Sequence, residues 1–412
     1  MKLPDVTATR CRPALRRRRA LARRPAASGL PALLLLVLVL GLGWQCGPAL
    51  ATPGTTAPGT TAPGTAAPGT AAPKPSPAPS QALTAVPAAS LRIVGGLASL
   101  NQYTRHELPF WTQTLPALTG GRVQAEIVPF DRAGIRGQDM LRLMQQGVVP
   151  FGTAQLNLAG AEDALIAAPD LPGLNPDMAS LRRSVAAFRP ALAARLRQRH
   201  GLELLAVYAY PAQVLFCKQA FNGLGDLRGR RIRVSGVPVA DLVEALGATP
   251  LLLPFVDIVP QARADAIDCA ITGATSGNTI GLHQVTSHLH TLAISWGLSA
   301  FAANGAAWAS LSPELRGLLQ QQLPLLEQSI WAEAERETGE GLACNTGTGP
   351  CRNSQRGQMV QVSPSSADRA RLRDLLTRTT LPRWLQRCGK GCAEIWNATL
   401  APVSGVTAKP LH

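Results

Sequence analysis

The chain has 412 residues, which is enough for two or three domains of ordinary size. Its formal charge of +15 is uneven, because residues 1–51 hold nine of the 40 lysines and arginines but only one of the 25 acidic residues. The remainder holds 31 basic and 24 acidic residues, a net charge of +7. This remainder has no basic stripe with interleaved aromatic residues, so nucleic acid is excluded as an expected partner.

Residues 1–51 have the features of a signal peptide. A basic run at residues 16–19 precedes an apolar stretch at about residues 30–44, which is short for a bilayer span of about 20 residues. Ala49-Leu50-Ala51 then provides small residues at the −3 and −1 positions of a cleavage site. We predict cleavage after Ala51 and a periplasmic location. An uncleaved N-terminal anchor and a lipoprotein modified at Cys46 are the alternatives.

Residues 52–87 predict a disordered tether. They begin with repeats of Pro-Gly-Thr-Thr-Ala and Pro-Gly-Thr-Ala-Ala and continue rich in proline, serine and alanine. Up to about residue 81 they contain no large apolar residue whose burial could offset the entropy of ordering the chain.

The globular part opens with an alternation of strand and helix patterns. Strands are predicted at residues 91–94, 123–128 and 148–154, with helices at 103–118 and 137–146 between them. This order predicts an α/β fold with a mainly parallel sheet.

The second half repeats the theme and ends in a long helix. Strands are predicted at 202–208, 213–218, 231–234, 249–254 and 266–271, with a helix at 239–246. Ser312-Pro313 is a favourable helix start, and the apolar spacing continues to about residue 338. Pro324 should kink or interrupt this helix. Its length could brace two lobes at once.

Six cysteines follow residue 52, and an even number in an oxidising compartment favours disulfides. Cys344 and Cys351 enclose a turn-forming segment, and Cys388 and Cys392 enclose Gly-Lys-Gly, so each pair can bridge locally. Cys217 and Cys269 remain, either as a third disulfide or as two buried free thiols. A zinc site at Cys388 and Cys392 lacks a second pair of suitable spacing.

Enzyme motifs are missing from the sequence, including a nucleophile elbow, a zinc-protease helix, a phosphate loop and a dinucleotide fingerprint. His283, His288 and His290 lack the spacing of a metal site and predict a solvated helix end. Asp257 and Asp268 could be interpreted as a catalytic acid–base pair, but Asp268 is better explained as a residue that caps or anchors its strand. We expect no catalysis, no cofactor and no metal.

Several segments, in this order and spacing, carry a family resemblance. They are Leu118-Thr119-Gly120-Gly121-Arg122-Val123, the Asp226 to Val234 segment ending in Arg-Ile-Arg-Val, Ala245-Leu246-Gly247-Ala248-Thr249-Pro250, Ala266-Ile267-Asp268, Asn304 with Trp308, and Leu311-Ser312-Pro313-Glu314-Leu315. From about residue 91 to residue 340 the chain resembles the substrate-binding subunits of tripartite ATP-independent periplasmic (TRAP) transporters, of the dicarboxylate-receptor type. The last 70 or so residues show little resemblance.

The resemblance implies a periplasmic solute-binding fold: two α/β lobes joined by a hinge, with the long helix spanning both. We expect residues 88–210 plus about 300–340 to form one lobe, and 211–299 plus about 341–400 the other. It further implies that a monomer captures a small organic acid and delivers it to TRAP membrane subunits. A receptor that presents its ligand to a sensor kinase and a secreted hydrolase are the alternatives.

The resemblance also implies that Arg233 binds the ligand's carboxylate. A guanidinium offers a bidentate fork to a carboxylate, and strand alternation lets Ile232 and Val234 pack while Arg233 points the other way. An arginine paired with a buried acid, or lying on the surface, is the alternative. Many relatives carry a second arginine about twenty residues upstream, where this chain has Gln213.

The remaining candidate ligand-binding residues are less specific. They are Phe255, Thr272, Trp296 as a wall of the cleft, and Gln155 with Asn157 at the end of a first-lobe strand. Phe130-Asp131 are first-lobe candidates too, although a plain turn explains them equally well. The glycine-, threonine- and serine-rich segment 272–278 is expected to be a turn with free amides and hydroxyls. Together these residues predict a ligand with one carboxylate and a partly apolar or hydroxylated body, in preference to a dicarboxylate.

Overall fold

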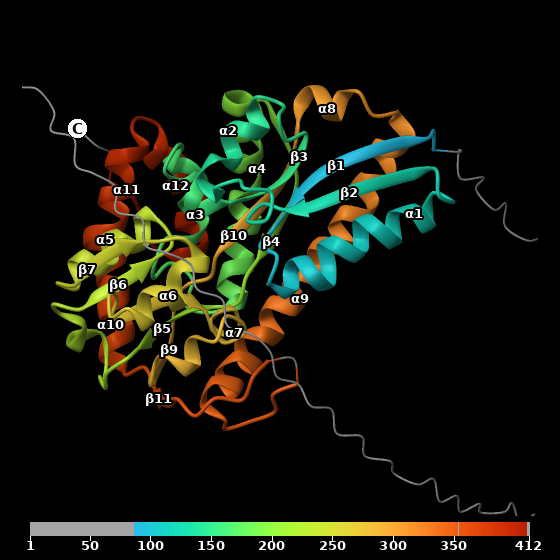
Figure 1. The fold of residues 1–412 in the computed structure, drawn as a ribbon. Coiled ribbons are helices and arrows are strands. Elements are labelled where there is room, and N and C mark those ends of the chain that lie inside the picture. Colours follow the sequence, from blue (N-terminus) through green and yellow to red (C-terminus); the bar gives the residue numbers. More distant parts are fainter. Residues whose placement is uncertain (1–85, 353, 410–412) are drawn as a thin grey trace, which may run out of the picture. The chain divides into compact units, whose positions relative to one another are not determined.

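Two mixed β-sheets organise the protein, and a computed structural model describes residues 86–352 and 354–409 (Figure 1). The predicted signal peptide and nearly all of the predicted tether lie outside the described residues. Each sheet is covered by helices to form one α/β lobe, so the predicted two-lobed fold class is confirmed. Lobe 1 denotes the first sheet with its helices, and lobe 2 the second.

The sheet of lobe 1 has the strand order β2-β1-β3-β10-β4. β1 (Ala89–Gly95) runs parallel to β2 (Val123–Pro129) and β3 (Phe151–Gln155). β10 (Leu298–Asn304) is antiparallel to β3 and to β4 (Leu202–Ala209). The predicted strand–helix alternation in the first part of the chain is therefore confirmed.

The second sheet has the order β11-β9-β5-β8-β6-β7. β6 (Arg231–Val234) runs parallel to β7 (Thr249–Leu252) and β8 (Cys269–Gly273). β5 (Gln213–Cys217) is antiparallel to β8 and β9 (His288–Ser295), and the short β11 (Val360–Val362) extends the edge beside β9.

Two predicted strands begin later than expected, each for a local reason. The strand predicted at 148–154 starts at Phe151, because Gly147 adopts a left-handed φ of 74° and the chain turns before the strand. The strand predicted at 266–271 is β8, which starts at Cys269. Asp265 has a φ of 55°, and Asp268 just before the strand forms an ion pair with Arg231, as its predicted anchoring role requires.

Helices cover both sheets. The helix predicted at 103–118 consists of the π-helical stretches η1 (Gln102–Glu107) and η2 (Phe110–Thr114), followed by α1 (Leu115–Leu118). The other α-helices are α2 (Met140–Gln145), α3 (Leu156–Ala159), α4 (Met178–His200), α5 (Val237–Ala245), α6 (Ile258–Arg263), α7 (Ala274–Thr279), α8 (Gly305–Ala309), α9 (Pro313–Thr346), α10 (Ser366–Leu375), α11 (Leu381–Cys388) and α12 (Cys392–Ser404). Short 3-10 or π turns complete the chain at η3 (Gly137–Asp139), η4 (Ala164–Asp170), η5 (Leu224–Leu227), η6 (Phe255–Asp257), η7 (Leu282–Gln284) and η8 (Leu376–Thr380).

The long helix α9 spans both lobes, as predicted (Figure 1). Its first half packs Leu319 and Leu323 into the core of lobe 1. Its last turns bind α7 of lobe 2, where Thr275 donates its hydroxyl to the Glu337 carbonyl and Asn345 donates to the Ala274 carbonyl. The helix continues to Thr346, beyond the expected end. The predicted interruption at Pro324 is wrong, since α9 is one continuous helix through that position.

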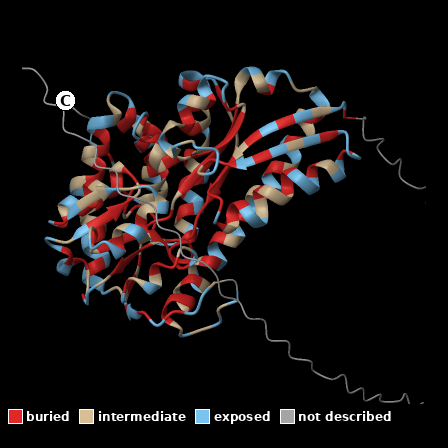
Figure 2. Cartoon of the chain, viewed as in Figure 1, coloured by how far each residue is buried: buried red, intermediate tan, exposed pale blue. Residues whose placement is uncertain are grey.

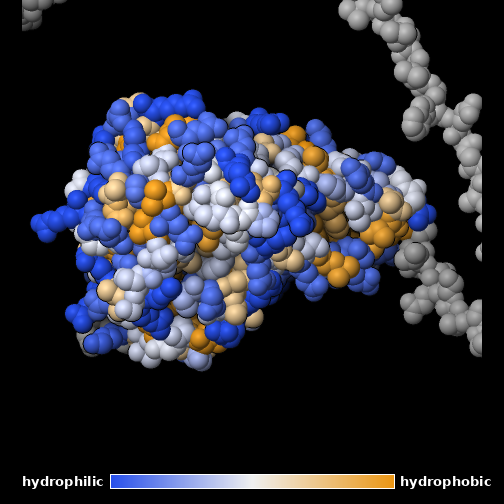
Figure 3. All heavy atoms as spheres, turned by 90° about the horizontal axis from the view of Figure 1, so that it is seen from below, coloured by the Kyte–Doolittle hydropathy of each residue, from blue (hydrophilic) through white to orange (hydrophobic). Residues whose placement is uncertain are grey.

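The buried residues run through both sheets and the inner faces of the helices (Figure 2). α12 packs against α4 and carries Trp396, which contacts Trp384 of α11, so the C-terminal helices extend the core beside lobe 1. On the face drawn in Figure 3 the hydrophobic residues form several separate groups among hydrophilic ones. None of the helices in the described ranges combines the length and hydrophobicity of a membrane span.

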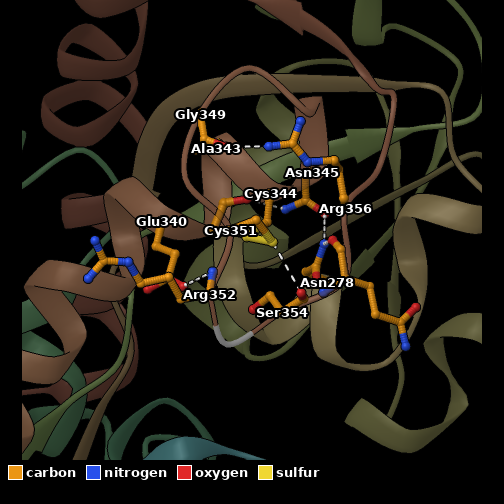
Figure 4. The surroundings of a disulfide bond; sticks show 12 residues. Asn278, Glu340, Ala343, Cys344, Asn345, Gly349, Cys351, Arg352, Ser354 and Arg356 are labelled. Carbon is orange, nitrogen blue, oxygen red and sulfur yellow. Dashed lines mark hydrogen bonds between the residues drawn. A yellow bond between two sulfur atoms is a disulfide. The ribbon is translucent and has the colours of Figure 1, made fainter. Parts of the chain in front are cut away.

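All three predicted disulfides are present in the structure. Cys217 and Cys269 lie directly opposite each other on β5 and β8 and are buried, with Cα atoms 4.1 Å apart. Cys388 and Cys392 join the ends of α11 and α12. The third disulfide lies between the last turn of α9 and the segment that follows (Figure 4).

Candidate functional site

A cavity of about 420 Å³ lies between the lobes. Its walls come from the carboxyl ends of the parallel strands in both sheets, where open α/β sheets commonly bind their ligands. Among its lining residues are six of the seven predicted ligand-binding side chains: Gln155, Asn157, Gln213, Arg233, Phe255 and Thr272.

Arg233 is held at the end of β6. Ile232 and Val234 on either side of it pack into the core of lobe 2, so the predicted alternation of faces is present. The guanidinium donates from Nε to the Leu253 carbonyl and from Nη1 to the Ile271 carbonyl, both at 3.0 Å. These bonds join Arg233 to the chain on both neighbouring strands and fix the direction of its planar fork.

The charge of Arg233 has no counterion in the described part of the chain. The residue is 4% exposed, none of the ion pairs among the described residues includes it, and Nη2 has no protein partner there. Burial lowers the pKa of Arg233 to about 10, which still leaves it protonated at neutral pH. A buried cation without a partner is costly, and an anion entering the cavity would remove that cost. Among the described residues, the structure therefore excludes the alternative that Arg233 is paired with a buried acid.

Gln213 occupies the start of β5, two strands away from Arg233, with β8 between them. Its Nε2 donates to the carbonyls of Pro211 at 3.0 Å and Trp296 at 2.8 Å. Those two carbonyls belong to two of the chain crossings between the lobes, from β4 to β5 and from β9 to β10. Gln213 thus joins both crossings to one wall of the cavity.

The segment 272–278 differs from the predicted turn. Thr272 and Gly273 end β8 and line the cavity, but residues 274–279 form the helix α7, and the Ala274 amide donates to the Ala212 carbonyl. Asn278 is fully buried and is not among the residues that line the cavity. It donates to the Asn345 side chain at 3.1 Å (Figure 4) and accepts from the Gln355 amide. The expectation of free amides and hydroxyls holds at most for its first residues and for Ser276, which also lines the cavity.

Trp296 does not line the cavity, and its predicted role as a cleft wall is wrong. Its side chain is 3% exposed and its indole N–H donates to the Asn175 carbonyl at 2.9 Å. Only its backbone contacts the site, because its carbonyl accepts from Gln213 and its amide donates to the partly buried Asp170. Strand periodicity could not foresee this, since the chain leaves β9 at Ser295 and turns at Gly297.

The apolar wall comes from both lobes. Phe255 lies in η6 just after β7, next to Leu252 and Val256, which are more than half exposed. Phe130 and Ile135 approach from lobe 1. The aliphatic members were not among the predicted site residues, because exposed leucine and valine side chains after a strand carry no signal of their own.

The polar wall of lobe 1 contains Gln155, Asn157, Asp131 and Tyr210. Asn157 reaches across to lobe 2, where its Nδ2 donates to the Ser235 carbonyl at 3.4 Å. Asp131 accepts the Ala98 amide at 3.0 Å, so it has both a turn-forming role and a place in the cavity. Tyr210 was not among the predicted site residues. Burial raises its pKa to about 12, so it stays a neutral hydroxyl.

A buried carboxyl group lies behind this wall. Glu107 is fully buried and accepts the Gly96 amide and the Thr153 hydroxyl. Burial raises its pKa to about 7. Between about pH 4.5 and pH 7 the native state therefore retains a proton that the unfolded state has released, and native stability falls as the pH rises through this range.

Replacing Glu107 by glutamine should make the free energy of unfolding less dependent on pH. The amide can accept from Gly96 and donate to Thr153, and it never ionises. We expect Glu107→Gln to be more stable than the wild type at pH 8 by about 3 kcal/mol, and nearly equal to it at pH 5. Urea unfolding at both pH values measures this. Glu126→Gln, on an exposed position of β2, is the control, and equal curves for both variants would contradict the prediction.

The comparisons with known proteins agree with this architecture. The family model of bacterial extracellular solute-binding proteins, family 7, matches residues 94–346. The chain belongs to this family. The resemblance inferred from the sequence is thereby confirmed, and Arg233, Gln213 and Thr272 all fall inside the matched residues.

The chain is also similar, at low sequence identity, to individual proteins. The ectoine-binding periplasmic protein TeaA of Halomonas elongata is 28% identical over 31% of this chain, a match that spans only 37% of that protein. A Bordetella pertussis extracytoplasmic solute receptor that binds pyroglutamic acid has a TM-score of 0.65 at 21% identity, covering 76% of this chain and 99% of the receptor. A TRAP periplasmic solute-binding protein of Desulfovibrio salexigens with bound orotic acid has a TM-score of 0.67 at 18% identity, with coverage of 76% and 99%. At these identities the structures show a shared fold.

Proposed function

We propose that this protein is a periplasmic receptor that captures a small organic acid between its lobes and delivers it to TRAP membrane subunits. The observation that supports this best is the buried guanidinium of Arg233 in the wall of a 420 Å³ cavity, without a counterion among the described residues. Structural relatives that bind pyroglutamate, orotate and galacturonate support the class of ligand, since each is a small carboxylate.

The mechanism is capture by closure. The carboxylate of the ligand meets the two-pronged donor of Arg233, while its body contacts Phe255 and the aliphatic side chains from lobe 1. The lobes then rotate about the crossings near residues 210 and 297, which shifts the population toward a closed form that the membrane subunits recognise. The residue boundaries of the lobes stay a prediction.

Identification of the natural ligand tests this function. The protein is purified from its periplasm without denaturation, and mass spectrometry then identifies the small molecules released on unfolding. We expect a carboxylic acid in the wild type and its loss in Arg233→Ala. Small-angle scattering should show a smaller radius of gyration once the ligand is added back. Release of a ligand without any carboxylate, or turnover of that ligand, would contradict the proposal.

A further inference from the structure

The carboxamide of Gln213 has a fixed orientation. Its Nε2 lies within hydrogen-bond distance of two carbonyl oxygens, those of Pro211 and Trp296. If the carboxamide were flipped, Oε1 would face both carbonyl oxygens. All three oxygens are acceptors, and no donor would lie between them. Oε1 therefore faces away from the crossings, and it has no hydrogen-bond partner among residues 86–352 and 354–409. The Gln213 side chain thus presents an acceptor and no donor.

Asn157 repeats this arrangement on the opposite wall. Its Nδ2 is used by the Ser235 carbonyl, which leaves Oδ1 without a partner in the described ranges. The fixed carboxylate of Asp131 adds further acceptor oxygens. Against these acceptors, the described lining of the cavity contains one buried cation, Arg233. Its other arginine, Arg136, is 72% exposed and already paired with Asp139.

We propose that the ligand is a monocarboxylate with an N–H or O–H group beside the carboxylate, and that Gln213 Oε1 accepts this donor. The inference rests on the proposed function, because Arg233 must hold the carboxylate. A second carboxylate placed at Gln213 would lose hydration and meet an acceptor oxygen of that residue, which offers it no donor. An N–H or O–H group of the ligand would instead give Oε1 a hydrogen bond. Arg233 and Gln213 are separated by one strand, β8, and this spacing suits a compact acid.

Pairs of acids that match in shape but differ in the donor test this proposal. Pyrrole-2-carboxylate is compared with furan-2-carboxylate, 5-oxopyrrolidine-2-carboxylate with 5-oxotetrahydrofuran-2-carboxylate, and mandelate with phenylacetate. Calorimetry on the full mature chain gives the ratio of Kd values within each pair. In the wild type we expect the donor-bearing acid of at least one pair to bind about tenfold or more tightly than its partner, because the partner leaves a buried acceptor unpaired.

The variant Gln213→Leu then assigns the effect to this residue. We expect the ratio within the pair to fall to about one, since a leucine side chain offers no acceptor. A general loss of affinity from disturbed crossings would weaken both acids and leave their ratio unchanged. If Gln213→Leu does not fold, Gln213→Met removes the same acceptor with a more flexible side chain.

The outcomes separate this inference from the proposed function. Equal affinities within every pair, tighter binding of succinate than of any donor-bearing acid, or a ratio that survives in Gln213→Leu would overturn the inference while leaving the carboxylate receptor intact. Failure of all six acids to bind would also overturn it. The proposed function fails if the released natural ligand contains no carboxylate or is turned over.

Discussion

Replacing Arg233 by alanine should reduce affinity for the carboxylate ligand by about a hundredfold or more. The guanidinium is buried and held by the Leu253 and Ile271 carbonyls, so the ligand meets a fork that is already oriented. Removing one partner of a buried, hydrogen-bonded charge pair costs about 2–5 kcal/mol. Arg233→Lys should recover only part of this loss, because an ammonium group cannot bind in the bidentate geometry. Calorimetry with the identified ligand measures both variants.

Arg136→Ala is the matched control for this prediction. Arg136 lines the same cavity, but it is largely exposed and its charge is paired with Asp139. We expect less than about a threefold change in Kd, since exposed ion pairs contribute little. Equal losses in the two variants would mean that the general positive potential of the cavity, and not Arg233, holds the ligand.

The Cys217–Cys269 disulfide should be the most stabilising of the three. It closes a 52-residue separation, for which the loop-entropy relation gives about 4 kcal/mol, against about 2 kcal/mol for Cys388–Cys392 with its separation of four. Both cysteines of the first pair are buried between β5 and β8, so Cys217→Ala/Cys269→Ala also loses core packing.

Urea unfolding followed by tryptophan fluorescence compares the two double variants. The expected order is wild type, then Cys388→Ala/Cys392→Ala, then Cys217→Ala/Cys269→Ala, with the largest drop in the free energy of unfolding at the last step. A reversed order would show that native packing around the C-terminal helices outweighs loop closure.

Much of the fold could be predicted from local sequence patterns, whereas the ligand site could be predicted only in part. The strand alternation around Ile232 and Val234 was enough to place Arg233 on the cavity side of β6. It could not show that the neighbouring residues lack an acid for Arg233, because ion pairing depends on which strands become neighbours. The error at Trp296 has the same origin, since the burial of its indole against Asn175 depends on a contact 121 residues away in sequence.

The helix α9 shows a case in which a local sequence rule was outweighed by tertiary packing. Pro324 argued for an interruption, because proline removes a backbone hydrogen bond and crowds the preceding turn. The helix nevertheless continues, with Leu323 and Leu326 on either side of the proline packed into the core of lobe 1. Tertiary burial outweighs the local penalty here, and helix propensities do not include that contribution.

The three disulfides lie away from the two chain crossings about which closure is proposed. Cys217–Cys269 lies within one sheet, Cys344–Cys351 closes the end of α9, and Cys388–Cys392 joins two consecutive helices. None of these covalent links ties β4 to β5 or β9 to β10, the crossings about which closure is proposed. Formation of these disulfides can therefore stabilise each part of the protein without fixing the proposed closure in an open or a closed state. The proposed closure should therefore not depend on whether the three disulfides are oxidised or reduced.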